Sequence, residues 1–197
     1  MSVFVKICGC RTREQVAAAV EAGADGLGFV FAPSPRQVTP ERARELCDGL
    51  PAHVQRIAVM HHPEADQWQA VQSVFRPDWL QTDADDFVGL TVDPAIRDLP
   101  VYRDIEGLDE EAVAVQPLAL FEAGASGQGQ RADWERAARL AARTDLILAG
   151  GLNPDNVAAA INQVKPWGVD VSSGVERQRG VKDLALIKAF VAAAKAE

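Results

Sequence analysis

The sequence is short of cysteine, of basic residues and of long apolar runs, and each shortage excludes a class of protein. Its 197 residues include 3 cysteines, too few for a disulfide framework, so we expect a reduced, cytoplasmic protein. The 28 acidic residues outnumber the 20 lysines and arginines and give a formal net charge of -8. Such a chain lacks the basic face that binds nucleic acid. A few backbone amides and one arginine could still hold a phosphate.

No stretch of the sequence predicts a membrane span. The apolar run at 146–149 (LILA) is far shorter than the roughly 18 residues that a spanning helix needs. Lys6 and Arg11 interrupt the apolar residues near the beginning of the chain, so we expect no secretory signal. No Pro/Ser-rich linker divides the sequence, and its length suits one compact domain, which we place at residues 1–197.

Short apolar segments alternate with helical patterns along the chain. We expect strands at 3–7, 25–31, 56–60, 79–81, 101–103, 118–122, 145–149 and 169–171. We expect helices at 13–21, 40–46, 64–74, 134–142, 154–161 (with Asn153 as its cap) and 181–194. This alternation favours an α/β fold, a closed TIM (βα)8 barrel rather than an open doubly wound sheet. Between residues 82 and 111 the pattern predicts no convincing helix.

In such a barrel the active site lies at the C-terminal ends of the strands. There the sequence places Cys8, Arg36, Glu122, Gly150, Gly151, Asp170, Ser172, Ser173 and Gly174. The glycine-containing loops after the seventh and eighth strands allow a phosphate close to the backbone, with helix amides directed at it. Either loop alone could equally be a tight turn, but the two together favour a phosphate site.

Two charged residues in this set, Arg36 and Glu122, could each have either a functional or a purely structural role. Arg36 lies in a stiff, proline-rich loop, and its planar fork suits a carboxylate or a phosphate. The alternative is a solvated surface arginine. Glu122 ends an apolar strand, and in a closed, semi-apolar site its carboxyl group could donate a proton. A glutamate that only caps the loop is an equal alternative.

The first strand carries a charge that requires a partner. Alternation along the strand places Phe4, Lys6 and Cys8 on one face. A buried lysine needs a counter-charge, and closure of the barrel makes the eighth strand a neighbour of the first. We therefore predict an ion pair between Lys6 and Asp170, whose positive end helps to hold Cys8 as a thiolate.

The sequence does not predict a metal centre. Cys8 and Cys10 have no second ligand pair, and the histidines at 61–62 have no third ligand, so we expect two exposed loop histidines. The acidic residues at 83, 85 and 86 are expected to form a solvated loop. We expect Cys47 and the 4 tryptophans to pack in the interior rather than bind a ligand.

Four groups of residues resemble the phosphoribosylanthranilate isomerase family. They are KICG at 6–9, GFVF at 28–31 with SPR at 34–36, LAGGL at 148–152 with PDNV at 154–157, and VDVSSGVE at 169–176 with GVKD at 180–183. The resemblance spans residues 5–190 in order. It implies a TIM barrel and an enzyme of tryptophan biosynthesis that uses no cofactor. The implied reaction is an Amadori rearrangement of N-(5-phosphoribosyl)anthranilate to 1-(2-carboxyphenylamino)-1-deoxyribulose 5-phosphate.

The same resemblance implies roles for single residues. Cys8 matches the general base of the family and Glu122 occupies the place of the general acid. Arg36 would pair with the anthranilate carboxylate, and the glycines and serines after the last two strands would hold the phosphate. We expect Gly9 to leave room for the sugar, and Cys10 to take no part.

The sequence departs from the family in two places. The family usually has aspartate where Glu122 stands, and we expect the loop that follows, which carries extra residues before Asp133, to set the longer side chain back. The family's Gln-Leu-His-Gly after the fourth strand is QTDA at 81–84 here. The lost histidine changes contacts near the substrate but not the type of reaction.

Two other functions fit parts of the pattern. One is an isomerase of a related phosphoribosyl aminosugar, a reaction that typically uses two aspartates, so the pair of Cys8 and Glu122 argues against it. The other is a non-catalytic barrel that binds a phosphosugar, which would not need a thiol and a carboxyl group facing each other. In each case the expected partner is a small phosphorylated molecule, and the sequence leaves monomer and homodimer open.

Overall fold

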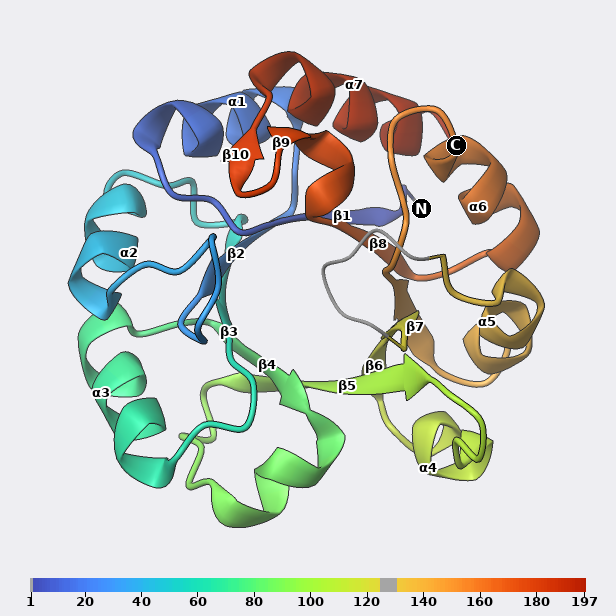
Figure 1. Ribbon diagram of the computed structural model, residues 1–197, viewed down its shortest axis with the longest axis horizontal. Helices are drawn as coiled ribbons and strands as arrows, with labels where there is room; N and C mark the ends of the chain where they lie inside the picture. Colours follow the sequence, from blue (N-terminus) through green and yellow to red (C-terminus); the bar gives the residue numbers. More distant parts are fainter. Residues whose placement is uncertain (1, 125–130) are drawn as a thin grey trace.

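The computed structural model describes residues 2–124 and 131–197, and its main sheet is a closed barrel of eight strands (Figure 1). The strands are β1 Phe4–Cys8, β2 Gly26–Val30, β3 Gln55–Val59, β4 Trp79–Asp83, β5 Arg97–Asp104, β6 Leu118–Ala123, β7 Asp145–Leu148 and β8 Gly168–Val171. Each strand pairs in parallel with the next, and β8 pairs with β1 to close the barrel. The predicted TIM barrel is confirmed.

Helices form a ring outside the strands, as Figure 1 shows. They are α1 Arg13–Ala22, α2 Pro40–Leu46, α3 Ala65–Phe75, α4 Glu110–Ala114, α5 Trp134–Ala141, α6 Val157–Val164 and α7 Leu184–Lys195. Asp133 and Asp183 cap α5 and α7 by accepting hydrogen bonds from backbone amides of the first turn. In the part of the chain that the structure describes, no helix has the length and apolar character needed to cross a membrane.

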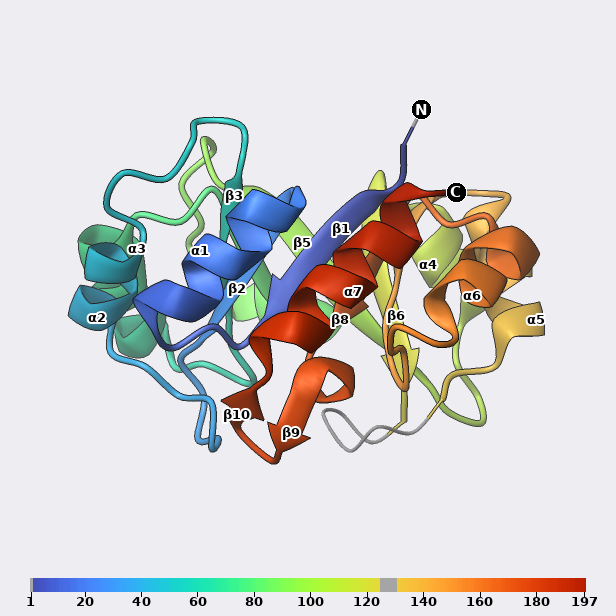
Figure 2. The same ribbon diagram turned by 90° about the horizontal axis from the view of Figure 1, so that it is seen from above.

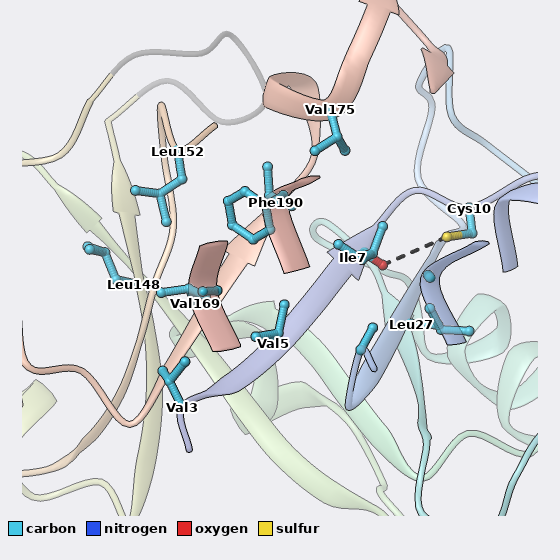
Figure 3. Close-up of a cluster of buried hydrophobic side chains, with 14 of the residues drawn as sticks. Val3, Val5, Ile7, Cys10, Leu27, Leu148, Leu152, Val169, Val175 and Phe190 are labelled. Carbon is cyan, nitrogen blue, oxygen red and sulfur yellow. Dashed lines mark hydrogen bonds between the residues drawn. The ribbon is translucent and has the colours of Figure 1, made fainter. Parts of the chain in front are cut away.

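Two apolar shells hold the barrel together, because alternate residues of each strand face inward and outward. In β1, Val5 and Ile7 face outward, and Figure 3 shows them with Val169 and Leu148 near Phe190 of α7. The inner shell is a separate cluster of buried residues that includes Ile57, Leu99, Val101, Leu120 and Ile147. The outer shell fixes the helices on the sheet and the inner shell fills the barrel.

Aromatic rings close the N-terminal end of the barrel. Phe4 stacks on Trp79 and on Trp167, with ring centroids 5.2 and 4.8 Å apart. Gly26 makes this possible, because a Cβ atom there would come within 2.9 Å of the Phe4 ring. Trp68, Trp79 and Trp134 are buried, as predicted, and Trp167 is partly buried. Trp79 and Trp167 form the floor of the barrel with Phe4.

Between β4 and β5 the structure agrees with the sequence prediction, whereas helix α6 begins later than predicted. The chain between β4 and β5 forms a 3-10 helix, η1 Ala84–Gly89, which agrees with the lack of a helical pattern there. Helix α6 begins at Val157 instead of residue 154, because Asn153 Oδ1 accepts hydrogen bonds from the amides of Asp155 and Asn156 and so forms a turn. Asn156 therefore takes the cap position that was predicted for Asn153.

The predicted start of the last helix at residue 181 is wrong. After β8 comes the short 3-10 helix η2 Ser173–Val175, and then a hairpin of β9 Glu176–Gln178 and β10 Val181–Lys182. The hairpin takes Val181 and Lys182 out of the helix, and α7 begins only at Leu184. Figure 2 shows this hairpin at the end of the barrel opposite the two chain termini.

Candidate active site

A cavity of about 240 Å³ opens at the C-terminal ends of the strands. Its wall brings together five residues that the sequence predicted for the site: Cys8, Arg36, Glu122, Asp170 and Ser172. Four ionisable residues that were not predicted as site residues also line it: His61, Asp83, Arg103 and Arg179. The apolar floor of Phe4 and Trp79 lies at the other end of the same strands, and the polar residues that line the cavity lie at this end, the mouth of the barrel.

The predicted ion pair beneath Cys8 is confirmed. Lys6 is fully buried, and its Nζ atom donates a hydrogen bond of 2.7 Å to Asp170 Oδ1. The register of β1 and β8 sets Lys6 directly beside Asp170. Burial alone would lower the pKa of Lys6, but the charge of Asp170, its hydrogen bond and the neighbouring Cys8 together outweigh burial and raise that pKa above 10.5. The lysine is therefore a fixed positive charge on the inner face of β1.

The Cys8 thiol lies next to this charge but is not held as a thiolate. Burial raises the pKa of Cys8 above 9.0 and outweighs Lys6 and Lys182, which both lower it. The prediction of a stabilised thiolate is thus wrong for the cavity as it stands, although the direction of the Lys6 effect was right. Gly28 on β2 leaves space for the sulfur, because a Cβ atom there would lie 3.0 Å from Cys8 Sγ.

Cys10 lies on the other side of the sheet from the cavity. Its side chain is fully buried in the outer apolar shell, where Sγ contacts the carbonyl oxygen of Ile7 at 3.9 Å (Figure 3). Burial raises the pKa of Cys10 to about 12. The two cysteines of the CGC segment therefore have different surroundings, and only Cys8 faces the cavity.

Glu122 pairs with an arginine in the wall of the cavity. Arg103 Nη1 donates a hydrogen bond of 2.5 Å to Glu122 Oε1, and Arg103 Nη2 donates one of 2.6 Å to Asp83 Oδ1. The wall of the cavity also includes apolar side chains such as Val59 and Val101, so the semi-apolar surroundings expected for Glu122 are present, together with an ion pair that was not predicted. Arg103 is the last residue of the strand predicted at 101–103, so the rule that selected the other strand ends could have found it.

Arg36 belongs to the wall of the cavity and is not a solvated surface residue. Only 6% of it is exposed, and its Nε and Nη2 atoms donate to the two oxygens of Glu176 at 2.7 and 2.9 Å. Burial alone would raise the pKa of Glu176, but hydrogen bonds from Arg36, Gly180 and Lys182 lower it to about 2. The bidentate pair fixes the guanidinium and leaves Nη1 for a ligand.

Gly9 makes room for Arg36 and not for a sugar. A Cβ atom at Gly9 would lie 2.8 Å from Cδ of Arg36, and the backbone of Gly9 has a φ of 83°, a conformation that favours glycine. The expectation that Gly9 leaves space for the substrate is corrected accordingly. The glycine places the arginine, and the arginine lines the cavity.

The loops after β7 and β8 pack tightly against each other. Gly150 and Gly151 have φ values of 87° and 66°, and a Cβ atom at Gly174 would lie 1.8 Å from the carbonyl oxygen of Leu152. Ser172 Oγ donates to the carbonyl oxygen of Cys8 at 3.1 Å, which ties the second loop to β1. The lining of the described cavity does not include the four loop residues predicted to hold the phosphate: Gly150, Gly151, Ser173 and Gly174.

The loop expected to set Glu122 back includes residues 125–130, which lie outside the described residues.

The family whose model matches residues 5–193 is described as N-(5'phosphoribosyl)anthranilate (PRA) isomerase. A relative with that enzyme's name from Roseiflexus sp. is 42% identical over an alignment of 210 positions, which covers 98% of this chain and 98% of the relative. A solved phosphoribosyl anthranilate isomerase in complex with reduced 1-(o-carboxyphenylamino)-1-deoxyribulose 5-phosphate is 33% identical, with a TM-score of 0.83 over 99% of this chain and 100% of that chain. Monomers generated from the dimeric enzyme of Thermotoga maritima match at the same identity and coverage, with a TM-score of 0.85.

Proposed function

The chain belongs to the N-(5'-phosphoribosyl)anthranilate isomerase family, and we propose that Cys8 and Glu122 are the general base and the general acid of its reaction. The chain is an isomerase of tryptophan biosynthesis. It converts N-(5'-phosphoribosyl)anthranilate to 1-(2-carboxyphenylamino)-1-deoxyribulose 5-phosphate by an Amadori rearrangement. The residues that carry this reaction are inferred from the geometry of the cavity and are the subject of the proposal.

One observation supports the assignment above all: a thiol and a carboxyl group line the same cavity. Cys8 ends β1 and Glu122 lies near the end of β6, so β7 and β8 separate them along the barrel wall. The isomerisation requires one proton to be given and another to be taken at different atoms of the sugar. Two groups on separate strands of one cavity suit that requirement.

The first step requires an acid. In its protonated form Glu122 gives its proton to the furanose ring oxygen, the bond between that oxygen and C1 breaks, and the nitrogen lone pair forms the Schiff base. Arg103 donates to Glu122 Oε1 at 2.5 Å and so positions the carboxyl group. Because glutamate is one methylene longer than the family's usual aspartate, this contact gives the longer side chain a defined direction.

The second step requires a base. The Cys8 thiolate removes the proton from C2 of the Schiff base. The electrons of that C–H bond form the C1–C2 double bond while the C1–N π electrons return to nitrogen, and the resulting enolamine becomes the ketone when C1 takes up a proton. Burial raises the pKa of Cys8, so the thiolate is a minor form in the open cavity. The neighbouring Lys6, held in place by Asp170 at 2.7 Å, favours the charged form within it.

The remaining site residues bind the two anionic ends of the substrate in this proposal. Arg36 offers Nη1 to the anthranilate carboxylate, since Glu176 occupies Nε and Nη2. The phosphate is bound by the backbone around Gly150, Gly151, Ser173 and Gly174. The positive φ values of Gly150 and Gly151, in the loop after β7, support this assignment. Asp170 and Ser172 line the cavity and hold Lys6 and the Cys8 carbonyl in position.

We also propose that residues 1–197 act as one domain in the cytoplasm, with a small phosphorylated substrate and neither nucleic acid nor a membrane as partner. The low cysteine count and the acidic balance of the chain support this. The Thermotoga maritima relative is dimeric, and either a monomer or a homodimer fits the cavity, whose described wall comes from one chain. Light scattering coupled to gel filtration distinguishes the two.

Anthranilate fluorescence tests the function directly. Added phosphoribosylanthranilate should lose its fluorescence in the presence of the wild-type chain, and the gene should restore growth of a tryptophan auxotroph. Glu122→Gln should lower kcat about 10²- to 10⁴-fold. Glu111→Gln serves as a matched control, since Glu111 is an exposed glutamate that also pairs with an arginine, Arg143. Equal turnover by the two variants would remove Glu122 from the mechanism.

A further inference from the structure

A second cluster of possible ligands lies beside the active-site cavity, between the loop that follows β3 and the end of β4. Each of His61, His62 and Asp83 offers one ligand atom, and these atoms all lie within 4.8 Å of one another. His61 Nδ1 lies 3.7 Å and His62 Nε2 lies 3.4 Å from Asp83 Oδ2. Ligand atoms at ~2.1 Å from a tetrahedral zinc ion are about 3.4 Å apart. The two separations from Asp83 Oδ2 therefore match those of ligands that share one ion.

The surroundings of His62 favour a cation between it and Asp83. His62 Nδ1 lies 2.8 Å from Asp86 Oδ1, so in a neutral ring the hydrogen belongs on Nδ1 and the lone pair on Nε2. That lone pair then faces Asp83 Oδ2 at 3.4 Å. In the neutral ring, this lone pair and Asp83 Oδ2 can therefore both bind one metal ion placed between them.

Other side chains hold two of the three ligands, His62 and Asp83, in position. Asp86 accepts hydrogen bonds from the backbone amide of His62 at 3.1 Å and from Thr82 Oγ1 at 2.5 Å. A carboxylate on the far nitrogen of a histidine is the usual device that orients a metal ligand and fixes its tautomer. Arg103 binds Asp83 through Oδ1 at 2.6 Å, which leaves Oδ2 for the ion.

We propose that His61, His62 and Asp83 bind one divalent first-row metal ion of the zinc type, through Nδ1, Nε2 and Oδ2. Two imidazoles and one carboxylate are ligands that suit Zn²⁺, Co²⁺ and Ni²⁺ better than Mg²⁺ or Ca²⁺. The side chains of His61 and His62 are 52% and 64% exposed, so an ion reaches them directly from solvent. A water molecule would fill the fourth coordination position of a tetrahedral ion.

The proposed site was not visible in the sequence. The adjacent histidines at 61–62 had no ligand at a characteristic spacing, because Asp83 comes from the next strand of the barrel and lies 21 residues beyond His62. The parallel pairing of β3 and β4 places the two strand ends side by side. His61 and Asp83 also line the cavity, so a bound ion would adjoin the place where the substrate binds.

Co²⁺ and Zn²⁺ titrations of the purified chain test the proposal without substrate. Calorimetry should show one Zn²⁺ bound per chain, and Co²⁺ should give the visible absorption of a nitrogen- and oxygen-bound ion. His62→Ala and Asp83→Asn should each weaken binding at least tenfold, and Asp86→Asn should weaken it less. His53→Ala is the matched control, because His53 is the third histidine of the chain and is exposed outside the cluster. It should leave binding unchanged.

Several results would overturn the proposal. One is equal affinity in the wild type and in the His61→Ala/His62→Ala double variant. Another is an intense thiolate-to-cobalt charge-transfer band, which would place the ion on a cysteine. Competition by Mg²⁺ at equal concentration would refute the ligand class. Because the histidines are exposed, thermal melting should show that the variants remain folded. Binding and isomerase turnover are separate measurements, so failure of one leaves the other standing.

Discussion

The two ends of the barrel are made from the same strands and have opposite character. At the N-terminal end, Phe4, Trp79 and Trp167 stack into an apolar floor. At the C-terminal end, Arg103 joins Asp83 to Glu122 and the cavity opens to solvent. Strand β1 alone passes from Phe4 at the floor to Cys8 at the mouth. A barrel strand can thus serve stability and chemistry at once, because these depend on residues at different heights.

The difference also separates two kinds of energetics. The floor gains stability from buried apolar area and ring stacking. At the mouth, charged groups are buried, and their desolvation costs free energy. Close ion pairs such as Lys6 with Asp170 at 2.7 Å offset that cost. Substitutions at the floor should therefore change stability and spare turnover. Substitutions at the mouth should change turnover more than stability.

The largest effect is expected at the mouth. Cys8→Ala removes the base and should lower kcat about 10²- to 10⁴-fold, with little change in thermal stability, because general-base catalysis contributes on that scale. Cys10→Ala is the control, since Cys10 is equally buried but lies outside the cavity. It should keep its turnover while losing some stability. Steady-state fluorescence assays of both variants check this, and comparable kcat values in the two would contradict the account.

The next largest effect is expected at the floor. Trp79→Ala removes a buried ring, only 5% exposed, that stacks on Phe4. It should lower the free energy of unfolding by about 3–5 kcal/mol, the usual cost of such a truncation. Urea unfolding measures this cost, and kcat/KM at 25 °C should stay within threefold of wild type. A large loss of kcat/KM in a folded variant would show that floor and mouth are coupled.

At the mouth, the positions of those side chains that depend only on strand geometry could be predicted from the sequence. The two-residue period of β1 and the closure of the barrel are enough to place Lys6 beside Asp170 and Cys8 above them. Both arguments need only the order of the strands. The family resemblance adds the roles of Cys8 and Glu122, which the geometry of a strand cannot supply.

What could not be predicted depends on which side chains meet across the barrel. The pair of Arg36 and Glu176 joins residues 140 positions apart, and the pattern of neither segment indicates it. The consequence for Gly9, which makes room for Arg36, was missed for the same reason. Strand β10 was predicted as the start of the last helix because Val181 continues the apolar pattern of α7. In each case tertiary contacts decide the local outcome.

A smaller effect on kcat is expected from substitution of Arg103, which in this account positions Glu122 and does not itself transfer a proton. Arg103→Gln keeps a donor but loses the charge and the fork that joins Glu122 to Asp83. It should lower kcat about tenfold, the equivalent of ~1.4 kcal/mol, and change KM little. Arg103→Lys should restore part of the loss. A pure KM effect would instead make Arg103 a substrate-binding residue, and no change in either constant would remove it from the site.

The smallest effect concerns the stability of the mouth in acid. The pKa of Glu176 is lowered from 4.5 to about 2 in the folded protein. Between these values the unfolded chain binds more protons than the folded one, so this contribution to stability is present above pH 4.5 and is lost as the pH falls towards 2. Glu176→Gln should flatten the decline in Tm over that range. Glu111→Gln, at an exposed pair, should leave most of it.

Alkylation of the Cys8 thiol tests the central claim most directly. Iodoacetamide reacts with the thiolate, so the rate should rise about tenfold per pH unit between pH 7 and 8, because burial raises the pKa of Cys8 above 9.0. Peptide mapping should show that turnover falls in proportion to modified Cys8, and that bound product slows the reaction. A chain fully alkylated at Cys8 that still isomerises phosphoribosylanthranilate at the wild-type rate would contradict the account.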